Sequence, residues 1–148
     1  ETGLTGAETG HLVLSTLHTN DAKSSVDRII DVFPPESKNQ VRIQMSSSLL
    51  AVVSQKLVPR ADGEGRVAVL EIMIKSPTIE NLILKNELDK IEEAIAASTN
   101  YYKMQTFNQA LEKFVMQGVI TNEEAINASN APDELKMRLS GFKREEGF

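Results

Sequence analysis

Residues 12–17, LVLSTL, form a nearly continuous apolar run with the length of one β-strand. Such runs are typical of parallel strands that are covered on both faces, whereas a half-exposed strand alternates apolar and polar residues. A parallel strand occurs almost only in proteins whose helices cover the sheet. The run therefore predicts an α/β fold, and it limits the choice of fold more than any other segment of the chain.

Helical periodicity and end signals flank this run. Residues 2–8 predict a short helix closed by Gly10, and Asn20 or Asp21 offers an N-cap for the next. The apolar residues of that second helix recur at helical spacing: Ala22, Val26, Ile29, Ile30 and Phe33. Pro34 and Pro35 end it and start a third helix. The apolar stripe expected for the third helix is Val41, Met45, Leu49, Val52 and Val53, with serines 46–48 as its weakest part.

Two β-rich segments follow. Residues 56–58 and 67–74 are strand-like, and residues 61–65 between them contain two glycines and two acidic residues. This composition predicts a β-hairpin. We expect the hairpin to extend the sheet that holds residues 12–17.

From Ser76 onward the sequence predicts short helices. Ser76 caps a helix that has Pro77 at its first position and runs through Leu84. The apolar stripes of the later helices are Leu88, Ile91 and Ile95; Phe107, Ala110, Leu111, Phe114 and Val115, ended by Gly118; Ala125 and Ile126 after a capping box at 121–124; and Leu135 and Leu139 after 130–133. We expect residues 143–146 to fray. The predicted domains are an α/β part, 1–75, and a helical part, 76–148.

Composition excludes several classes of function. The net charge of -5 and a pI near 5.1 argue against a protein that coats nucleic acid or an anionic membrane. The absence of cysteine excludes disulfides, Cys-ligated zinc and thiol nucleophiles. No apolar run approaches the ~20 residues of a transmembrane segment. The chain opens at Glu1-Thr2-Gly3 with neither Met nor a signal-peptide pattern, so we expect a piece of a longer protein.

His11 and His18, the two histidines, bracket the apolar run. Seven steps along an extended strand span ~23 Å and place the two side chains on opposite faces. The spacing therefore argues against a metal shared by the two imidazoles, and no metal site is predicted.

His18 lies at the carboxyl end of the predicted strand, where open α/β sheets bind ligands. Its imidazole could hydrogen-bond a phosphate oxygen or orient a water, or it could satisfy a backbone group at the end of the strand. His11, at the amino end, is predicted to be structural. No G-x-x-x-x-G-K-[ST] loop is present, and residues 63–65 form a turn rather than a phosphate loop.

Several motifs carry a family resemblance. Residues 7–20, AETGHLVLSTLHTN, closely resemble the histidine box of the type II/type IV secretion ATPase family. Residues 27–34, DRIIDVFP, are similar to the PilT-like branch, which retracts type IV pili in twitching motility. Further matches to this branch are SQKLVP at 54–59, GRVA and EIM within 65–73, and MQTFNQAL at 104–111.

The resemblance implies the back half of a RecA-like P-loop NTPase domain followed by short helices. It also implies that the phosphate loop, the acidic Walker B strand, the catalytic glutamate and the arginine fingers precede residue 1. ATP and Mg²⁺ are the implied ligands of the intact protein. On this resemblance His18 contacts the γ-phosphate, Thr19 is a second nucleotide-binding residue, and His11 belongs to the same catalytic box.

The resemblance further implies a homohexamer in the cytoplasm, held at the inner membrane by the platform protein of the pilus, with no nucleic-acid partner and no transmembrane segment. Assembly and secretion ATPases often carry a four-cysteine zinc insert near residues 60–66, where this chain has a short turn. This difference favours retraction. Residues 78–85, TIENLILK, are similar to a helix linked with retraction, and we expect Glu80, Asn81 and Lys85 to face solvent or a partner there.

Two alternatives remain at this point. One is an assembly or secretion ATPase of the same family. The other is a non-catalytic interaction module, in which residues 76–140 dock onto a partner and residues 1–75 are scaffold. Because the chain contains no phosphate loop, we expect residues 1–148 alone to hydrolyse no ATP.

Overall fold

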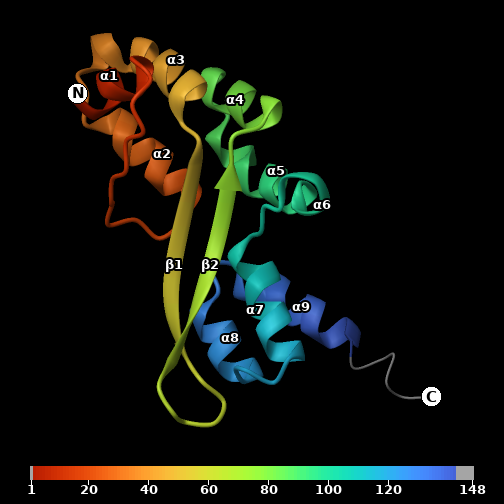
Figure 1. Ribbon diagram of the computed structural model, residues 1–148. Coiled ribbons are helices and arrows are strands. Elements are labelled where there is room, and N and C mark those ends of the chain that lie inside the picture. The colour runs from red at the N-terminus through yellow and green to blue at the C-terminus, as the bar shows by residue number, and fades with distance from the viewer. Residues whose placement is uncertain (1, 143–148) are drawn as a thin grey trace. The chain divides into compact units, whose positions relative to one another are not determined.

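The computed structural model describes residues 2–142 of the chain (Figure 1). It divides into two compact units, Glu1–Ser54 with Ile72–Met104 and Gln55–Glu71 with Gln105–Phe148. The sequence-based division after residue 75 follows the type of secondary structure rather than compactness, and it stays a prediction.

The first unit contains eight helical elements among its described residues, and most of them pack around one core. They are α1 Thr2–Glu8, α2 Ala22–Asp31, the 3₁₀ helix η1 Pro35–Ser37, α3 Lys38–Ser48, α4 Pro77–Leu84, the second 3₁₀ helix η2 Leu88–Lys90, α5 Ile91–Ala97 and α6 Thr99–Tyr102. The largest buried side chains of the core come from four of these helices, from the hairpin and from the segment after α6: Val26, Met45, Met73, Ile79, Ile83, Ile91, Ile95 and Met104. The ion pair of Lys23 with Asp89 joins α2 to the second 3₁₀ helix and lowers the pKa of Asp89 through its hydrogen bond.

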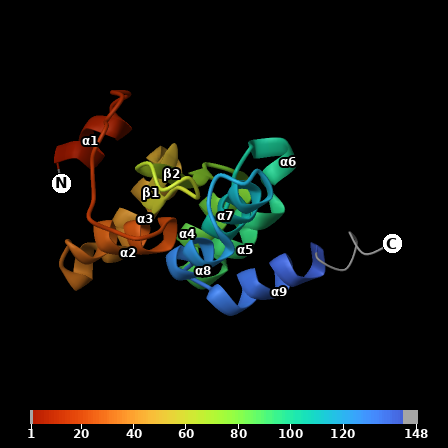
Figure 2. The same ribbon diagram turned by 90° about the horizontal axis from the view of Figure 1, so that it is seen from below.

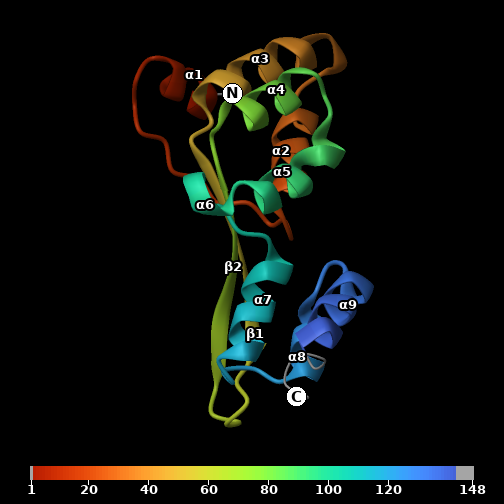
Figure 3. The same cartoon turned by 90° about the vertical axis from the view of Figure 1, so that its right-hand side faces the viewer.

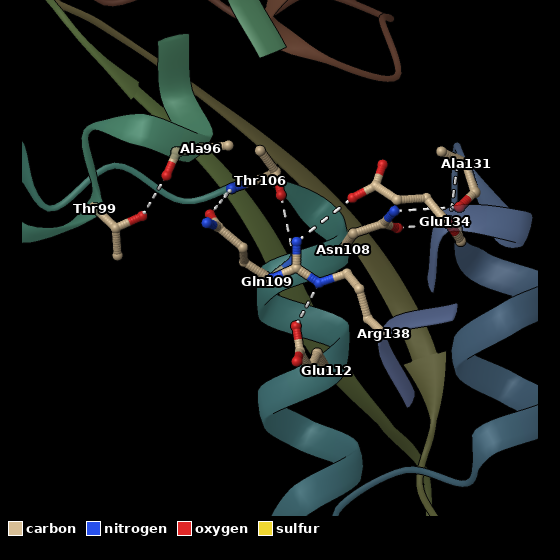
Figure 4. Close-up of polar contacts among 10 residues, drawn as sticks. Ala96, Thr99, Thr106, Asn108, Gln109, Glu112, Ala131, Glu134 and Arg138 are labelled. Carbon is tan, nitrogen blue, oxygen red and sulfur yellow. Dashed lines mark hydrogen bonds and ion pairs between the residues drawn. The ribbon is translucent and has the colours of Figure 1, made fainter. Parts of the chain in front are cut away.

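The second unit packs three helices against the distal half of the hairpin (Figure 3). These helices are α7 Phe107–Met116, α8 Asn122–Ala128 and α9 Pro132–Phe142. Their buried core is Val58, Val69, Phe107, Ala110, Leu111, Ile120, Ala125 and Leu135. Polar contacts add to the packing of α9, because Arg138 donates to Glu112 of α7 at 2.8 Å and to Glu134 at 3.5 Å (Figure 4).

The predicted hairpin is present. Strand β1, Ala51–Pro59, pairs with β2, Arg66–Ile74, in a two-stranded sheet. The strand begins earlier than expected, so the assignment of Val52 and Val53 to the helical stripe is wrong. Helix α3 ends at Ser48, and Leu49 already has an extended backbone. Two adjacent β-branched valines favour a strand over a continued helix.

The turn of the hairpin is closed by backbone and side-chain bonds. Arg60 N–H donates to the Gly65 carbonyl at 3.1 Å, and Gly63 and Gly65 have positive φ angles of 76° and 80°. The carboxylate of Asp62 accepts from the Arg60 guanidinium and from the Glu64 N–H at 2.9 Å. Both contacts favour the ionised form, the one with Arg60 most, and they hold the pKa of Asp62 below its ordinary value.

The predicted strand at 12–17 is absent, which corrects the most constraining expectation from the sequence. Residues 11–19 form an irregular segment between α1 and α2 (Figure 2), and Leu12 and Leu14 are 75% and 87% exposed. Within residues 2–142 the two hairpin strands pair only with each other, so the run has no neighbouring strand to bond. An unpaired strand gains neither ladder hydrogen bonds nor apolar burial. The expectation that the hairpin extends a sheet containing this run is wrong for the same reason.

Most predicted helix starts are confirmed by their caps. The side chain of Asp21 accepts from Ser24 N–H at 2.7 Å, Ser76 Oγ from Ile79 N–H at 3.2 Å, and Thr121 Oγ1 from Glu124 N–H at 3.2 Å. The sequence analysis missed the capping box at the start of α7, where Thr106 and Gln109 bond each other's backbone N–H. The fraying expected at 143–146 lies outside the described residues. Within 2–142, no helix has the length and apolar character that crossing a bilayer requires.

Helix α4 allows a matched test of the core. Leu82 is 8% exposed and Leu84 is 41% exposed on the same helix. Replacing Leu82 by Ala removes buried methyl groups and leaves a cavity, so we expect a loss of ~2–5 kcal/mol in the free energy of unfolding. We expect Leu84→Ala to change it by about 0.5 kcal/mol or less. Urea denaturation of both variants checks this, and equal losses would contradict the burial of Leu82.

Candidate functional site

The segment from the end of α1 to the start of α2 holds both histidines. Helix α1 ends in a Schellman motif, in which Gly10 N–H donates to the Ala7 carbonyl and His11 N–H donates to the Gly6 carbonyl, each at 3.1 Å. Gly10 takes a φ of +90°, which an L side chain rarely adopts. The chain is therefore turned back at Gly10, and His11 lies against the end of α1.

The imidazole of His11 interacts with this helix end. Its Nδ1 lies 3.1 Å from Thr9 Oγ1 and 3.3 Å from the Gly6 carbonyl oxygen, while Thr9 Oγ1 itself donates to the Thr5 and Gly6 carbonyls. These carbonyls also accept backbone N–H groups, the Thr5 carbonyl from Thr9 and the Gly6 carbonyl from His11, so the side chains add further contacts at the helix end. His11 thus caps α1. The structural role that strand polarity suggested for His11 stays a prediction.

Val13 continues the contact with α1. A Cβ on Gly3 or on Gly6 would lie 3.6 Å from a Val13 methyl group. The two glycines, three residues apart on one helical face, therefore receive the Val13 side chain. The sequence analysis missed this contact, and the signal for it was the i, i+3 spacing of the two glycines beside an apolar run.

His18 differs from His11 in its surroundings. It is exposed, and no protein group within the described residues hydrogen-bonds its ring. The residues just after it are fixed, since Asp21 caps α2. An exposed imidazole beside an ordered helix start can accept or donate one hydrogen bond to a ligand.

Thr19 is partly buried and already bonded. Its Oγ1 lies 2.6 Å from Ser25 Oγ, and Ser25 Oγ donates its proton to the Asp21 carbonyl at 2.8 Å. Thr19 is therefore the donor to Ser25, and a donation from Thr19 to a phosphate would require that bond to break. The sequence analysis did not identify Ser25 as a partner of Thr19. Its position next to Val26, on the buried side of α2, was a signal that its hydroxyl would need a hydrogen-bond partner.

No group of three or more His, Asp or Glu side chains within residues 2–142 is arranged to hold a metal ion. A shallow, open depression lies beside the end of α1, lined by threonines 2, 5 and 9 with Gly6 and His11. Two of its polar groups, the Thr9 hydroxyl and the His11 imidazole, already contact each other and the end of α1.

Helix α4 carries the second group of candidate residues. Ile79, Leu82 and Ile83 are buried, as their spacing predicts. Asn81 and Lys85 are exposed and Glu80 is half-buried. The helix ends in another Schellman motif, with Asn86 at a φ of +58°, Asn86 N–H donating to the Ile83 carbonyl and Glu87 N–H donating to the Leu82 carbonyl.

Comparison with known proteins places this arrangement in a family. The profile described as "Type II/IV secretion system protein" matches residues 1–127. The chain belongs to the type II/IV secretion system protein family. Family members similar to it include a "Twitching motility protein" of Neisseria gonorrhoeae, 48% identical over 122 residues, which are 82% of this chain and 32% of that protein. The "Type IV pilus retractation ATPase PilT" of Pseudomonas aeruginosa is 44% identical over 130 residues, 88% of this chain and 37% of that protein.

A solved structure of the same family supports the fold. The crystal structure described as the pilus retraction motor PilT with bound ADP superposes with a TM-score of 0.81 at 43% identity, covering 92% of this chain and 37% of that one. This likeness confirms the expected fold class, α/β and part of a RecA-like domain. The chain spans about a third of the length of the relatives it matches.

The turn at Gly10 can be tested by a pair of alanine substitutions. Gly10 has positive φ, so Gly10→Ala forces a strained backbone and should lower the free energy of unfolding by about 1 kcal/mol. Gly6 is helical, and an added Cβ would make ordinary contact with Val13, so Gly6→Ala should be neutral or stabilising. Urea denaturation measures both. A neutral Gly10→Ala would show that the helix does not end as described.

Proposed function

We propose that the full-length protein containing this chain is a hexameric motor ATPase that drives retraction of type IV pili. The observation that carries the proposal is the joint match in sequence and fold: 43–48% identity over most of the chain to proteins named for twitching motility and pilus retraction, with a TM-score of 0.81. The match spans both compact units rather than one motif.

The hairpin supports retraction over assembly or secretion. Its turn at residues 60–65 is short, closed by the Arg60–Gly65 backbone bond and by the pair of Arg60 with Asp62. Members of the family that assemble or secrete often carry a four-cysteine zinc insert at this place, and the chain contains no cysteine. The turn is too short to contain such an insert, and it has no cysteine to bind zinc.

In the proposed reaction ATP binds near the histidine segment. His18 would contact the γ-phosphate, and its exposure without a protein partner among the described residues supports this role. Thr19 would act at the same place, either by giving up its bond to Ser25 or by holding the start of α2 in position. His11 would orient the segment through its contact with α1.

Mg²⁺ accompanies ATP in phosphoryl transfer and neutralises charge on the phosphates. The described residues do not fit a Mg²⁺ site of their own, since they present no group of three or more His, Asp or Glu side chains arranged for a metal ion and Thr19 is already bonded. We assign the metal and the phosphate loop to parts of the full-length protein other than this chain, and propose that residues 1–148 alone do not hydrolyse ATP.

Helix α4 is the proposed coupling element. Its buried face holds it in the first core, while Asn81 and Lys85 are exposed and available to a partner. We propose that Glu80, Asn81 and Lys85 pass the motion of the ring to the pilus machinery. The proposed partner is the platform protein at the inner membrane, and the proposed location is the cytoplasmic face of the pilus base.

Deleting the gene separates the candidate functions. A retraction motor removes pili from the surface, so its loss should abolish twitching and leave excess surface pili. Loss of an assembly ATPase should leave none. Electron microscopy of surface pili and a twitching assay make the comparison, with the complemented strain as control. Absent pili would overturn the assignment to retraction, and unchanged pili and twitching would overturn a motor function in this system.

The two histidines of the full-length protein should differ in their effect on ATP hydrolysis. His18→Ala removes a hydrogen bond to a charged group, worth ~1.5–3 kcal/mol, and should slow hydrolysis about ten- to hundredfold. His11→Ala removes a cap of α1 and should have a smaller effect on the rate. Phosphate-release assays on folded hexamers test the difference. Equal losses in both variants would contradict the assignment.

A further inference from the structure

Helix α3 lies between the histidine segment and the proposed coupling helix within one compact unit. Gln44 Nε2 of α3 donates to Glu8 Oε2 of α1 at 3.0 Å. Arg42 Nε of α3 donates to Asn86 Oδ1, just after α4, at 3.1 Å. One helix of eleven residues therefore has polar contacts with α1, which precedes the histidine segment, and with Asn86, which follows α4.

The α3–α4 pair is bonded at two separate places. At the end of α3, Lys75 N–H donates to the Leu50 carbonyl at 2.8 Å, and the Lys75 ammonium group bonds the Ser47 carbonyl. Arg42, near the middle of α3, bonds Asn86, which follows the carboxyl end of α4. Because α4 begins near the end of α3 and ends near its middle, the two helices run antiparallel. These bonds, with a buried apolar interface between the helices, favour movement of α3 and α4 as one body.

The Arg42 contact is directed at a specific backbone feature. Asn86 has a φ of +58°, which closes α4 in its Schellman motif. Asparagine tolerates this conformation, and glycine adopts it more readily. Glycine could therefore adopt this backbone conformation as well. Only the side-chain amide of Asn86 supplies the oxygen that Arg42 binds. A guanidinium group near the carboxyl end of a helix is in addition favoured by the helix dipole.

At the other side of α3, α1 is joined to the histidine segment. His11 caps α1, and Val13 packs over Gly3 and Gly6. A displacement of the segment on ligand binding would therefore act on α1, then through Glu8 and Gln44 on α3.

We propose that α3 is the transmitting element between nucleotide and coupling helix, with Gln44 and Arg42 as its positioning residues. This inference rests on the proposed function, because it requires a nucleotide at the histidine segment. On this proposal α3 has one position when nucleotide is bound and another when it is not. The Arg42–Asn86 bond transfers the change of position to α4. Neither residue touches the nucleotide.

The test is hydrogen exchange in the full-length protein with and without a non-hydrolysable ATP analogue, read at residues 77–87 by mass spectrometry. In the unaltered protein the analogue should change the exchange of this segment. Gln44→Ala, Arg42→Ala and Asn86→Gly should each reduce that change about twofold or more, with analogue affinity and unfolding midpoint kept. Gln40→Ala, at an exposed position of the same helix, is the matched control and should leave the response intact.

Asn86→Gly is the decisive variant, because it is compatible with the positive φ and removes the side chain that carries the acceptor oxygen. The double variant Arg42→Ala with Asn86→Gly should reduce the response no further than either single change. Additive losses, or a full response in the single variants, would overturn the role of this bond. An unaltered protein that binds the analogue without any response in α4 would overturn the inference and leave the ATPase function standing. A protein that binds no ATP would overturn the proposed function itself.

Discussion

The pairing register of the β1–β2 hairpin is the constraint on which both compact units depend. Val58 and Val69 enter the core of the second unit, and Met73 enters the core of the first. Side chains alternate between the faces of a strand, so a slip of β2 by one residue would move both Val69 and Met73 out of their cores. The turn opposes such a slip through the bond of Arg60 N–H to Gly65 and the glycines at positive φ. A short turn therefore has structural consequences for two cores.

The difference between the two histidines also originates in the backbone. Gly10 reverses the chain at the end of α1 and places His11 where it satisfies carbonyls of that helix. His18, seven residues later, is exposed and precedes the residue that caps the start of α2. The same residue type thus serves as a helix cap in one case and is available to a ligand in the other. In the proposed motor, the first histidine orders the segment and the second contacts the nucleotide.

Local signals predicted most of the fold. Asp21, Ser76 and Thr121 cap helices as expected, because an N-cap depends on a few neighbouring residues. The strand at 12–17 failed because strand formation depends on a neighbour elsewhere in the chain, and the described residues supply none. The contacts around the candidate site likewise depend on residues that are distant in the sequence.

Contacts between distant segments could not be predicted from periodicity. The bonds of Gln44 with Glu8 and of Arg42 with Asn86 join exposed polar residues that have no pattern in common. The strand polarity argument separated His18 from His11 although the strand is absent in this chain. The part of that argument that still holds is the order along the chain: His11 follows α1, and His18 precedes Asp21, the N-cap of α2.

The central claim is that the histidine segment presents His18 to the γ-phosphate of ATP. Affinities of the full-length protein for a non-hydrolysable ATP analogue and for ADP, measured by calorimetry on the unaltered protein and on His18→Ala, test it most directly. Loss of a charged hydrogen bond should weaken the ATP analogue about tenfold or more and leave ADP, which has no γ-phosphate, unchanged. An equal loss for both nucleotides, or for neither, would contradict the claim.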